Sequence, residues 1–201
     1  AHIGHYTGLM YLGKEAANTQ QTPVYTMPGM KTYLENNGPW SQLGTQKNIL
    51  FTPLENETPV SVTNNITVTP FTVPHRDEFS ETVGYKIQGP HKKAHFIPDI
   101  DKWEKWTKDI NEEIRKVDYA FIDATFYSGA EINNRDIATI PHPFVIESME
   151  RFKQFTKTEK QKIIFIHFNH TNPLIDSTSK EYKQVLEAGF TIARKGQVFN
   201  L

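Results

Sequence analysis

The chain has 201 residues, with 22 lysine and arginine residues against 23 aspartate and glutamate residues. A chain of this length fits one domain, and its 37% apolar and 12% aromatic content is enough for a packed core. Balanced charge and the lack of an apolar run near the ~20 residues that span a bilayer argue against nucleic acid or a membrane as partner, and the lack of cysteine excludes disulfides and thiolate metal ligands.

The first third of the chain predicts alternating helices and strands. An apolar stripe at helical spacing predicts a helix over residues 6–18, and residues 24–27 predict a short buried strand. Residues 29–36 predict a second helix, which ends before an Asn-Gly-Pro turn. The Val-, Thr- and Ile-rich stretch 60–73 has an Asn-Asn turn and predicts a β-hairpin or two successive strands.

The rest of the chain continues this α/β pattern. Further strands are predicted at residues 83–87, 95–97, 119–122 and 162–166. Further helices are predicted at residues 101–116, 143–155 and 179–188. In the first of these helices Trp103, Trp106 and Ile110 recur at a spacing of three or four, which predicts an apolar face. Residues 190–193 and 198–201 predict a terminal hairpin.

Polar side chains of the metal-ligand type follow four apolar segments that predict strands. They are His75, Asp99, Asp123 and His167. Because sites in layered α/β folds collect at strand ends, where several loops converge on a rigid sheet, we expect these side chains to lie close together. Taken singly, each could be a capping residue, and Asp123 is interpreted as a loop residue rather than as a ligand.

The chain opens with two histidines, His2 and His5, followed by a turn of small residues. Two imidazoles three residues apart can lie on one side of a loop that enters a helix, and neutral imidazole is the commonest protein ligand of transition metals. A polar loop or the remnant of a tag is the alternative. Together with the strand-end residues, the pair favours a metal site.

Five motifs spread along the chain share one resemblance. They are HIGHYTGL (residues 2–9), NGPWSQL (37–43), VPHRDEFS (73–80), FIPDID (96–101) and IHFNHTNP (166–173). Together they resemble the metallo-β-lactamase superfamily, and most closely its branch that contains the pyrroloquinoline-quinone biosynthesis protein B. The resemblance covers nearly the whole chain. It implies an α/β fold, an αββα sandwich formed as a single domain over residues 1–201, with a metal centre at one edge of the two sheets.

The resemblance also implies which residues hold metal. The first metal motif of the family is His-x-His-x-Asp-His, whose second and last histidines fall on His2 and His5. The later ligands fall on His75, on a bridging Asp99 and on His167. One ion would then take His2, His75 and Asp99, and another would take His5, His167 and Asp99. Zinc is the favoured ion, with manganese or iron as alternatives.

Two departures from the family pattern change what is expected. Gly4 stands where the motif has its aspartate, which normally holds the second ion, so one ion or a weakly held pair is expected. The first histidine of the motif would precede Ala1, and so would the family's N-terminal strands. A sheet that lacks these strands has open edges and an exposed apolar face, so we expect a homodimer or a higher oligomer.

Three further residues are candidates for the chemistry, beside Asp99. His142 stands at the start of a predicted helix, and by resemblance to phosphodiesterase relatives it would contact substrate or donate a proton; the alternative is a turn histidine between two prolines. His170, one turn beyond His167, is a candidate catalytic residue or outer ligand. Arg76 would orient His75 or bind an anionic substrate.

The leading hypothesis is a metal-dependent hydrolase that uses a metal-activated water on a small phosphodiester, phosphotriester, or related ester or lactone. The first alternative is an Fe(II)-dependent oxygenase, because the resembled branch acts in quinone-cofactor synthesis and because sites of two histidines and one carboxylate suit Fe(II). The second alternative is a metal-poor scaffold that binds a partner without catalysis. No secretory signal is visible, and the compartment is left open.

Overall fold

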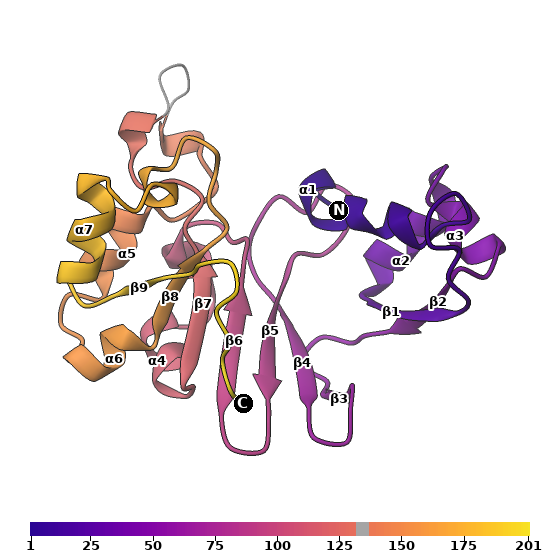
Figure 1. The fold of residues 1–201 in the computed structure, drawn as a ribbon, viewed down its shortest axis with the longest axis horizontal. Helices are drawn as coiled ribbons and strands as arrows, with labels where there is room; N and C mark the ends of the chain where they lie inside the picture. The colour runs from indigo at the N-terminus through magenta and orange to yellow at the C-terminus, as the bar shows by residue number, and fades with distance from the viewer. Residues whose placement is uncertain (132–136) are drawn as a thin grey trace.

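The computed structural model describes residues 1–131 and 137–201, and its largest element is a seven-stranded sheet (Figure 1). In spatial order, the strands are β3 (Val60–Ser61), β4 (Thr67–Thr72), β5 (Val83–Gln88), β6 (Lys93–Ile97), β7 (Tyr119–Asp123), β8 (Ile163–Ile166) and β9 (Thr191–Ile192). Neighbours from β3 to β6 are antiparallel, whereas those from β6 to β9 are parallel. The predicted hairpin and the predicted strands of this sheet are confirmed.

Helices accompany the parallel half of this sheet because parallel strands need crossover connections. They are α4 (Ile110–Arg115), α5 (Val145–Arg151), α6 (Lys157–Gln161) and α7 (Lys180–Glu187), and they gather at one end of the molecule in Figure 1. The helix predicted over residues 179–188 is confirmed as α7. The helix predicted over residues 143–155 is shorter, and α6 follows it as a separate helix because the Thr156 side chain caps the backbone N–H of Glu159.

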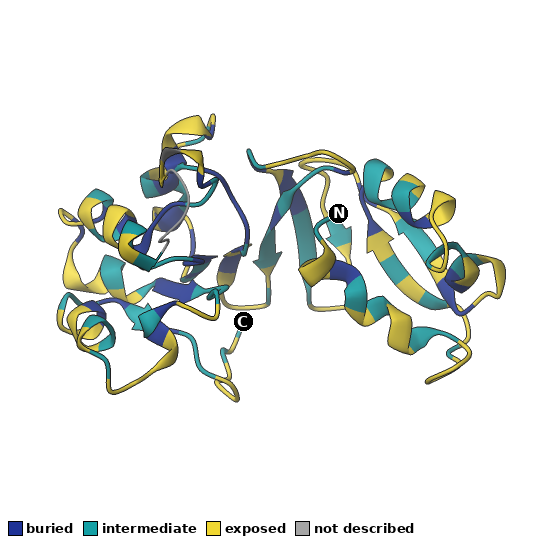
Figure 2. Cartoon of the chain, turned by 90° about the horizontal axis from the view of Figure 1, so that it is seen from above, coloured by how far each residue is buried: buried dark blue, intermediate teal, exposed yellow. Residues whose placement is uncertain are grey.

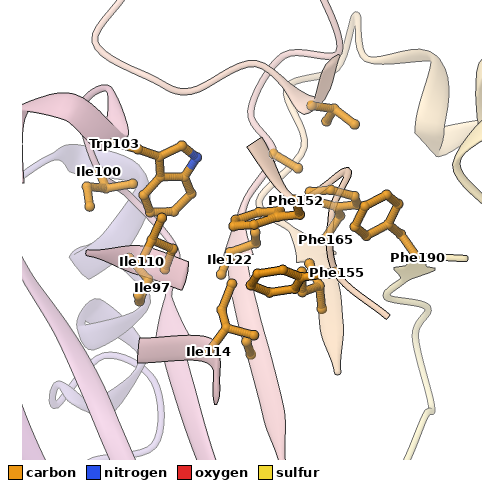
Figure 3. Close-up of a cluster of buried hydrophobic side chains, with 14 of the residues drawn as sticks. Ile97, Ile100, Trp103, Ile110, Ile114, Ile122, Phe152, Phe155, Phe165 and Phe190 are labelled. Carbon is orange, nitrogen blue, oxygen red and sulfur yellow. The ribbon is translucent and has the colours of Figure 1, made fainter. Parts of the chain in front are cut away.

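The hydrophobic core lies between the parallel strands and these helices. Figure 3 shows Phe152 and Phe165 close to Ile122, and all three side chains are fully buried. Burying a side chain of this size contributes about 1.5–3 kcal/mol to stability. The packed core therefore fixes β6, β7 and β8 and the loops that leave their carboxyl ends.

A second, two-stranded sheet lies at the other end of the molecule. Its strands β1 (Thr22–Thr26) and β2 (Ile49–Pro53) are parallel, and they are connected through α2 (Pro28–Asn36) and α3 (Ser41–Thr45). The strand predicted at residues 24–27 and the helix predicted at residues 29–36 are confirmed as β1 and α2. In Figure 1, α1 (Ile3–Tyr6) lies between this end and the large sheet.

Three further predicted elements are wrong in extent or kind. The helix predicted over residues 6–18 is replaced by α1 and a 3-10 helix (Thr7–Leu12), in a segment that glycines weaken as an α-helix. The helix predicted over residues 101–116 is a 3-10 helix (Trp103–Lys105) followed by α4, although its apolar face is buried as predicted. The terminal hairpin is absent from the described residues, because residues 191–192 pair in parallel with β8 and residues 198–201 form no strand.

Figure 2 shows how burial follows this architecture, with buried residues along the strands and exposed residues on the outer faces of the helices. Among the described residues, no helix has the length and apolar character needed to cross a membrane.

Candidate metal centre

Four histidines surround Asp99, which lies in the loop after β6 and is 5% exposed. His75 Nε2 is 3.0 Å from Asp99 Oδ1, and His142 Nδ1 is 3.3 Å from the same oxygen. His5 Nε2 and His2 Nδ1 are 3.3 Å and 3.4 Å from Asp99 Oδ2. The buried Asp99 carboxylate therefore contacts imidazoles from three segments. His2 and His5 belong to the N-terminal segment, His75 follows β4, and His142 precedes α5.

Among the described residues, three groups of side chains have ligand atoms close enough to hold an ion, within 4.8 Å of one another. The groups are His2, His75 and Asp99; His5, Asp99 and His167; and Asp99, Asp123 and His142. The first two groups are the ones that the sequence resemblance implies. Each offers two imidazoles and one carboxylate and leaves further coordination positions for water or substrate.

The buried polar atoms of this cluster fit a divalent cation. The His75 side chain is fully buried, and within the described part of the chain neither ring nitrogen has a hydrogen-bond partner. Asp99 Oδ1, 3.0 Å from His75 Nε2, also lacks one. Leaving such an atom unsatisfied costs about 1–3 kcal/mol, so their gathering at one point indicates a cation that would satisfy them together.

The electrostatics keep Asp99 ionised. Burial by itself would raise the pKa of this carboxyl group, but the close contacts with His5 and His75 and the charge of the neighbouring imidazoles bring its pKa far below the ordinary value. For His167, burial opposes protonation, but the hydrogen bond and charge of Asp123 outweigh it and raise the pKa. The site therefore holds a ready carboxylate among basic groups.

Asp123 contacts His142 of the candidate centre, and its interpretation as a loop residue is wrong because it lies within β7. It ends β7 and is fully buried, and its Oδ2 lies 2.8 Å from His142 Nδ1. Its carboxylate also accepts backbone N–H groups from Ile100 and Thr125. Its position directly after an apolar strand was the signal in the sequence, but the same position is also typical of capping residues.

His167 stands at the end of β8 with a φ of +62°, in the left-handed region that non-glycine residues seldom adopt. This backbone directs its ring between two neighbours. Nε2 lies 3.1 Å from His5 Nε2, and Nδ1 lies 2.9 Å from Thr125 Oγ1. Strained backbone of this kind, which costs of order 1–3 kcal/mol, clusters at functional sites.

The remaining predicted site residues divide into two groups. Arg76 and His142 line the open cleft over the cluster, together with the histidine ligand candidates. His170 is exposed, contacts Asn169 through Nδ1 at 3.1 Å and belongs to none of the three ligand groups found among the described residues. The chain after His167 is irregular, so spacing by one helical turn does not apply there, and the role of His170 as a catalytic residue or outer ligand stays a prediction.

A residue that the sequence did not indicate also contacts the cluster. Glu78 Oε2 lies 3.4 Å from His2 Nε2, while the other ring nitrogen of His2 faces Asp99. A carboxylate that accepts the far N–H of a ligating imidazole fixes its tautomer and orientation. Glu78 thus favours the tautomer of His2 that leaves Nδ1 free toward Asp99.

The sequence has relatives among known proteins. Residues 1–168 match the family described as the beta-lactamase superfamily domain. Over 126 residues the chain is 30% identical to coenzyme PQQ synthesis protein B of Gluconobacter oxydans, a match that covers 60% of this chain and 40% of that protein. The matched region thus spans about two fifths of the length of the first curated relatives.

Solved structures share the fold. Zinc-bound PqqB from Methylobacterium extorquens has a TM-score of 0.79 at 21% identity, covering 100% of this chain and 68% of that one. A diphosphatase from the PhnP family has a TM-score of 0.66 at 18% identity, covering 100% and 69%. At these identities the likeness concerns the arrangement of the sheets and helices.

Proposed function

Because this chain belongs to the beta-lactamase superfamily and has the metallo-β-lactamase fold, we propose that it is a metal-dependent hydrolase of phosphoesters. The observation that carries the proposal is the pair of two-histidine, one-carboxylate groups that share Asp99. Such a pair suits two ions, or one tightly held ion, with positions left for water and an ester. A phosphodiester or phosphotriester is the substrate class, and related esters or lactones would meet the same groups.

Different residues of the chain would bind the metal and bind the substrate. Asp99 would be shared between the two ligand groups, and its low pKa keeps it charged without proton loss on binding. A bound divalent ion, zinc first, supplies Lewis acidity and a water of lowered pKa. Support for zinc comes from the zinc-bound relative of the same fold. Arg76, exposed in the cleft, would pair with the anionic oxygens of the substrate.

His142 is the proposed proton-transfer residue. Its Nδ1 lies 2.8 Å from the buried Asp123 carboxylate, which accepts the Nδ1–H and so leaves Nε2 to hold or release a proton. The residue lines the same cleft as the ligand candidates, within reach of a leaving group held there. Asp123 thereby acts as a positioning residue for His142.

The test combines metal content with turnover. Protein purified without chelators is analysed for bound metal, and hydrolysis of bis(p-nitrophenyl) phosphate is followed with zinc or manganese. We expect stoichiometric metal and turnover that Asp99→Asn and His75→Ala abolish. His91→Ala serves as the control, because His91 is exposed in the turn between β5 and β6, at the opposite end of β6 from Asp99. Metal-free protein with full activity, or turnover that survives Asp99→Asn, would contradict the proposal.

A second candidate is favoured by a specific observation, the 30% identity to coenzyme PQQ synthesis protein B. Cofactor synthesis of that kind is compatible with Fe(II) and O₂ chemistry, and two histidines with one carboxylate form a site that iron oxygenases use. Bound iron with oxygen consumption, in protein that does not hydrolyse phosphodiesters, would support the oxygenase. Sub-stoichiometric metal of any kind would support the non-catalytic scaffold.

A further inference from the structure

One wall of the cleft over the metal centre is aromatic. Phe79 is 64% exposed, and its ring centroid lies 5.7 Å from that of Tyr33. The Tyr33 hydroxyl is 2.8 Å from the hydroxyl of Tyr6, and the Tyr6 ring stands edge-on to Trp40 at 5.0 Å. We call Phe79, Tyr33 and Tyr6 the aromatic wall; Trp40 supports it on the side of Tyr6.

The aromatic wall is fixed relative to the ligand candidates by the chain itself. Tyr6 directly follows His5, and Phe79 directly follows Glu78, which contacts His2. All three wall residues line the cleft that also exposes His142 and the ligand groups. A group seated on the wall would therefore have a defined position with respect to the ions.

The exposed ring of Phe79 lies in the cleft over the candidate metal centre, where it can contact a bound ligand. A ring of this size exposes apolar area to water, and covering it with a planar aromatic group gains both burial and an offset or edge-to-face contact. The free edge of Phe79 is also the end of a row of rings whose other members are already packed on one another. A further ring would extend this row.

The positive charge of Arg76 favours a ligand that also carries an anionic group. Arg76 directly follows His75, is exposed, and lines the same cleft as Phe79. Its guanidinium can pair with two oxygens of a phosphoryl group. Glu78 is the acidic neighbour; its carboxylate contacts His2 and also interacts with the charge of Arg76, while Arg76 itself lines the cleft.

We propose that the aromatic wall and Arg76 select an anionic phosphoester that carries an aromatic substituent. The inference rests on the proposed hydrolase function and names its substrate class. In the reaction, a bond forms from the oxygen of water to phosphorus, and the phosphorus–oxygen bond to the aromatic alcohol breaks. One proton of the water stays on the phosphoryl product or passes to the buffer, the other reaches the aryloxide by way of His142 so that it leaves as the alcohol, and no oxidant is needed.

The experiment separates recognition from turnover by using phosphonates, which are not hydrolysed. Binding of phenylphosphonate and methylphosphonate to the zinc-loaded protein is measured by titration calorimetry. We expect phenylphosphonate to bind about tenfold more tightly, the gain of one aromatic contact with its buried area. Phe79→Ala should remove this preference and leave methylphosphonate affinity unchanged, and Phe79→Tyr should restore it.

Two controls make the result specific. Tyr11→Ala removes an aromatic side chain that is 62% exposed and does not line the cleft, so the preference should persist. Arg76→Ala should weaken both phosphonates, whereas Arg76→Lys should restore part of that affinity. Because Phe79 and Arg76 are exposed, all these variants are expected to fold.

The possible results distinguish failure of the aromatic subsite from failure of the hydrolase function. Equal affinity for both phosphonates, no binding of phenylphosphonate, or equal losses for both in Phe79→Ala would overturn the aromatic wall. Failure to hydrolyse bis(p-nitrophenyl) phosphate, with the phenyl preference and its loss in Phe79→Ala intact, would overturn the hydrolase and leave the aromatic subsite standing.

Discussion

The hydroxyl oxygen of Thr125 lies 2.9 Å from Nδ1 of His167, so a side chain just beyond β7 meets the histidine that ends β8. The same oxygen donates its hydrogen to Asp123 Oδ1 at 2.6 Å. With its hydrogen engaged there, the Thr125 oxygen can only accept from the ring of His167. Nδ1 of His167 therefore carries the proton, and Nε2 is the nitrogen left for a metal ion.

Replacing Thr125 by valine should weaken metal binding. Valine keeps the volume but removes the acceptor for His167 Nδ1–H and the donor to Asp123, which frees the ring to rotate or change tautomer. Losses of about 10–100-fold in metal affinity are typical of such outer partners. The affinity is measured by competition with a chromogenic chelator. Thr125→Ser restores the hydroxyl and should recover most of it, and an unchanged affinity in Thr125→Val would refute the role.

The positive φ of His167 predicts an unusual ranking of substitutions in metal-free protein. Glycine adopts this conformation freely, whereas a residue with a Cβ pays roughly 1 kcal/mol for it. His167→Gly should therefore be more stable than His167→Ala by about that amount, the reverse of the order in a helix. Urea denaturation in excess chelator measures the difference. Ala equal to or more stable than Gly would show that this backbone is relaxed.

Gly4 offers a gain-of-function test of the second ion. A Cβ placed on Gly4 meets no heavy atom within 4 Å, so a larger side chain has room beside His5. Gly4→Asp restores the carboxylate of the family motif, and we expect the weaker of the two ions to bind at least about tenfold more tightly, as one more charged ligand implies. Zinc titration calorimetry gives stoichiometry and affinity. Gly4→Asn, which keeps the shape without the charge, should give a much smaller gain.

Much of the site could be predicted from the sequence because its residues follow apolar strands. His75, Asp99 and His167 come directly after such segments or one residue later, and the core fixes the strand ends. His2 and His5 were found from their spacing. The structure brings all five together, while their role as ligands stays a prediction, as do the homodimer and the ester substrate.

Other parts of the site depend on contacts that no local pattern shows. Thr125 and Glu78 reach the histidines from segments 42 and 76 residues away along the chain, so only the folded structure reveals them. The expected spacing of His170 by one helical turn does not apply, because His167 has a left-handed backbone, and the role of His170 stays a prediction. Segment 41–59, which lacks clear periodicity, gave no prediction and forms α3 and β2.

His95, in β6 but away from the metal centre, predicts a pH dependence of folding. It is 3% exposed against the ring of Phe71, and burial lowers its pKa to about 4 from an ordinary 6.5. Glu113, 4.0 Å from Nε2, opposes this shift, while nearby lysines add to it. The folded protein therefore keeps His95 neutral at a pH at which the unfolded chain already protonates it.

The sign follows from this difference. The stabilisation is complete above pH 6.5 and is lost as the pH falls toward about 4, a total of roughly 3 kcal/mol in the unfolding free energy. Urea denaturation of chelator-treated protein between these pH values should show the loss, and His95→Leu should flatten it. The two proteins differ only at residue 95, so the difference between the two curves belongs to His95. Exposed His91→Leu should leave the slope unchanged, and a wild-type slope in His95→Leu would mean that His95 is solvated and not buried.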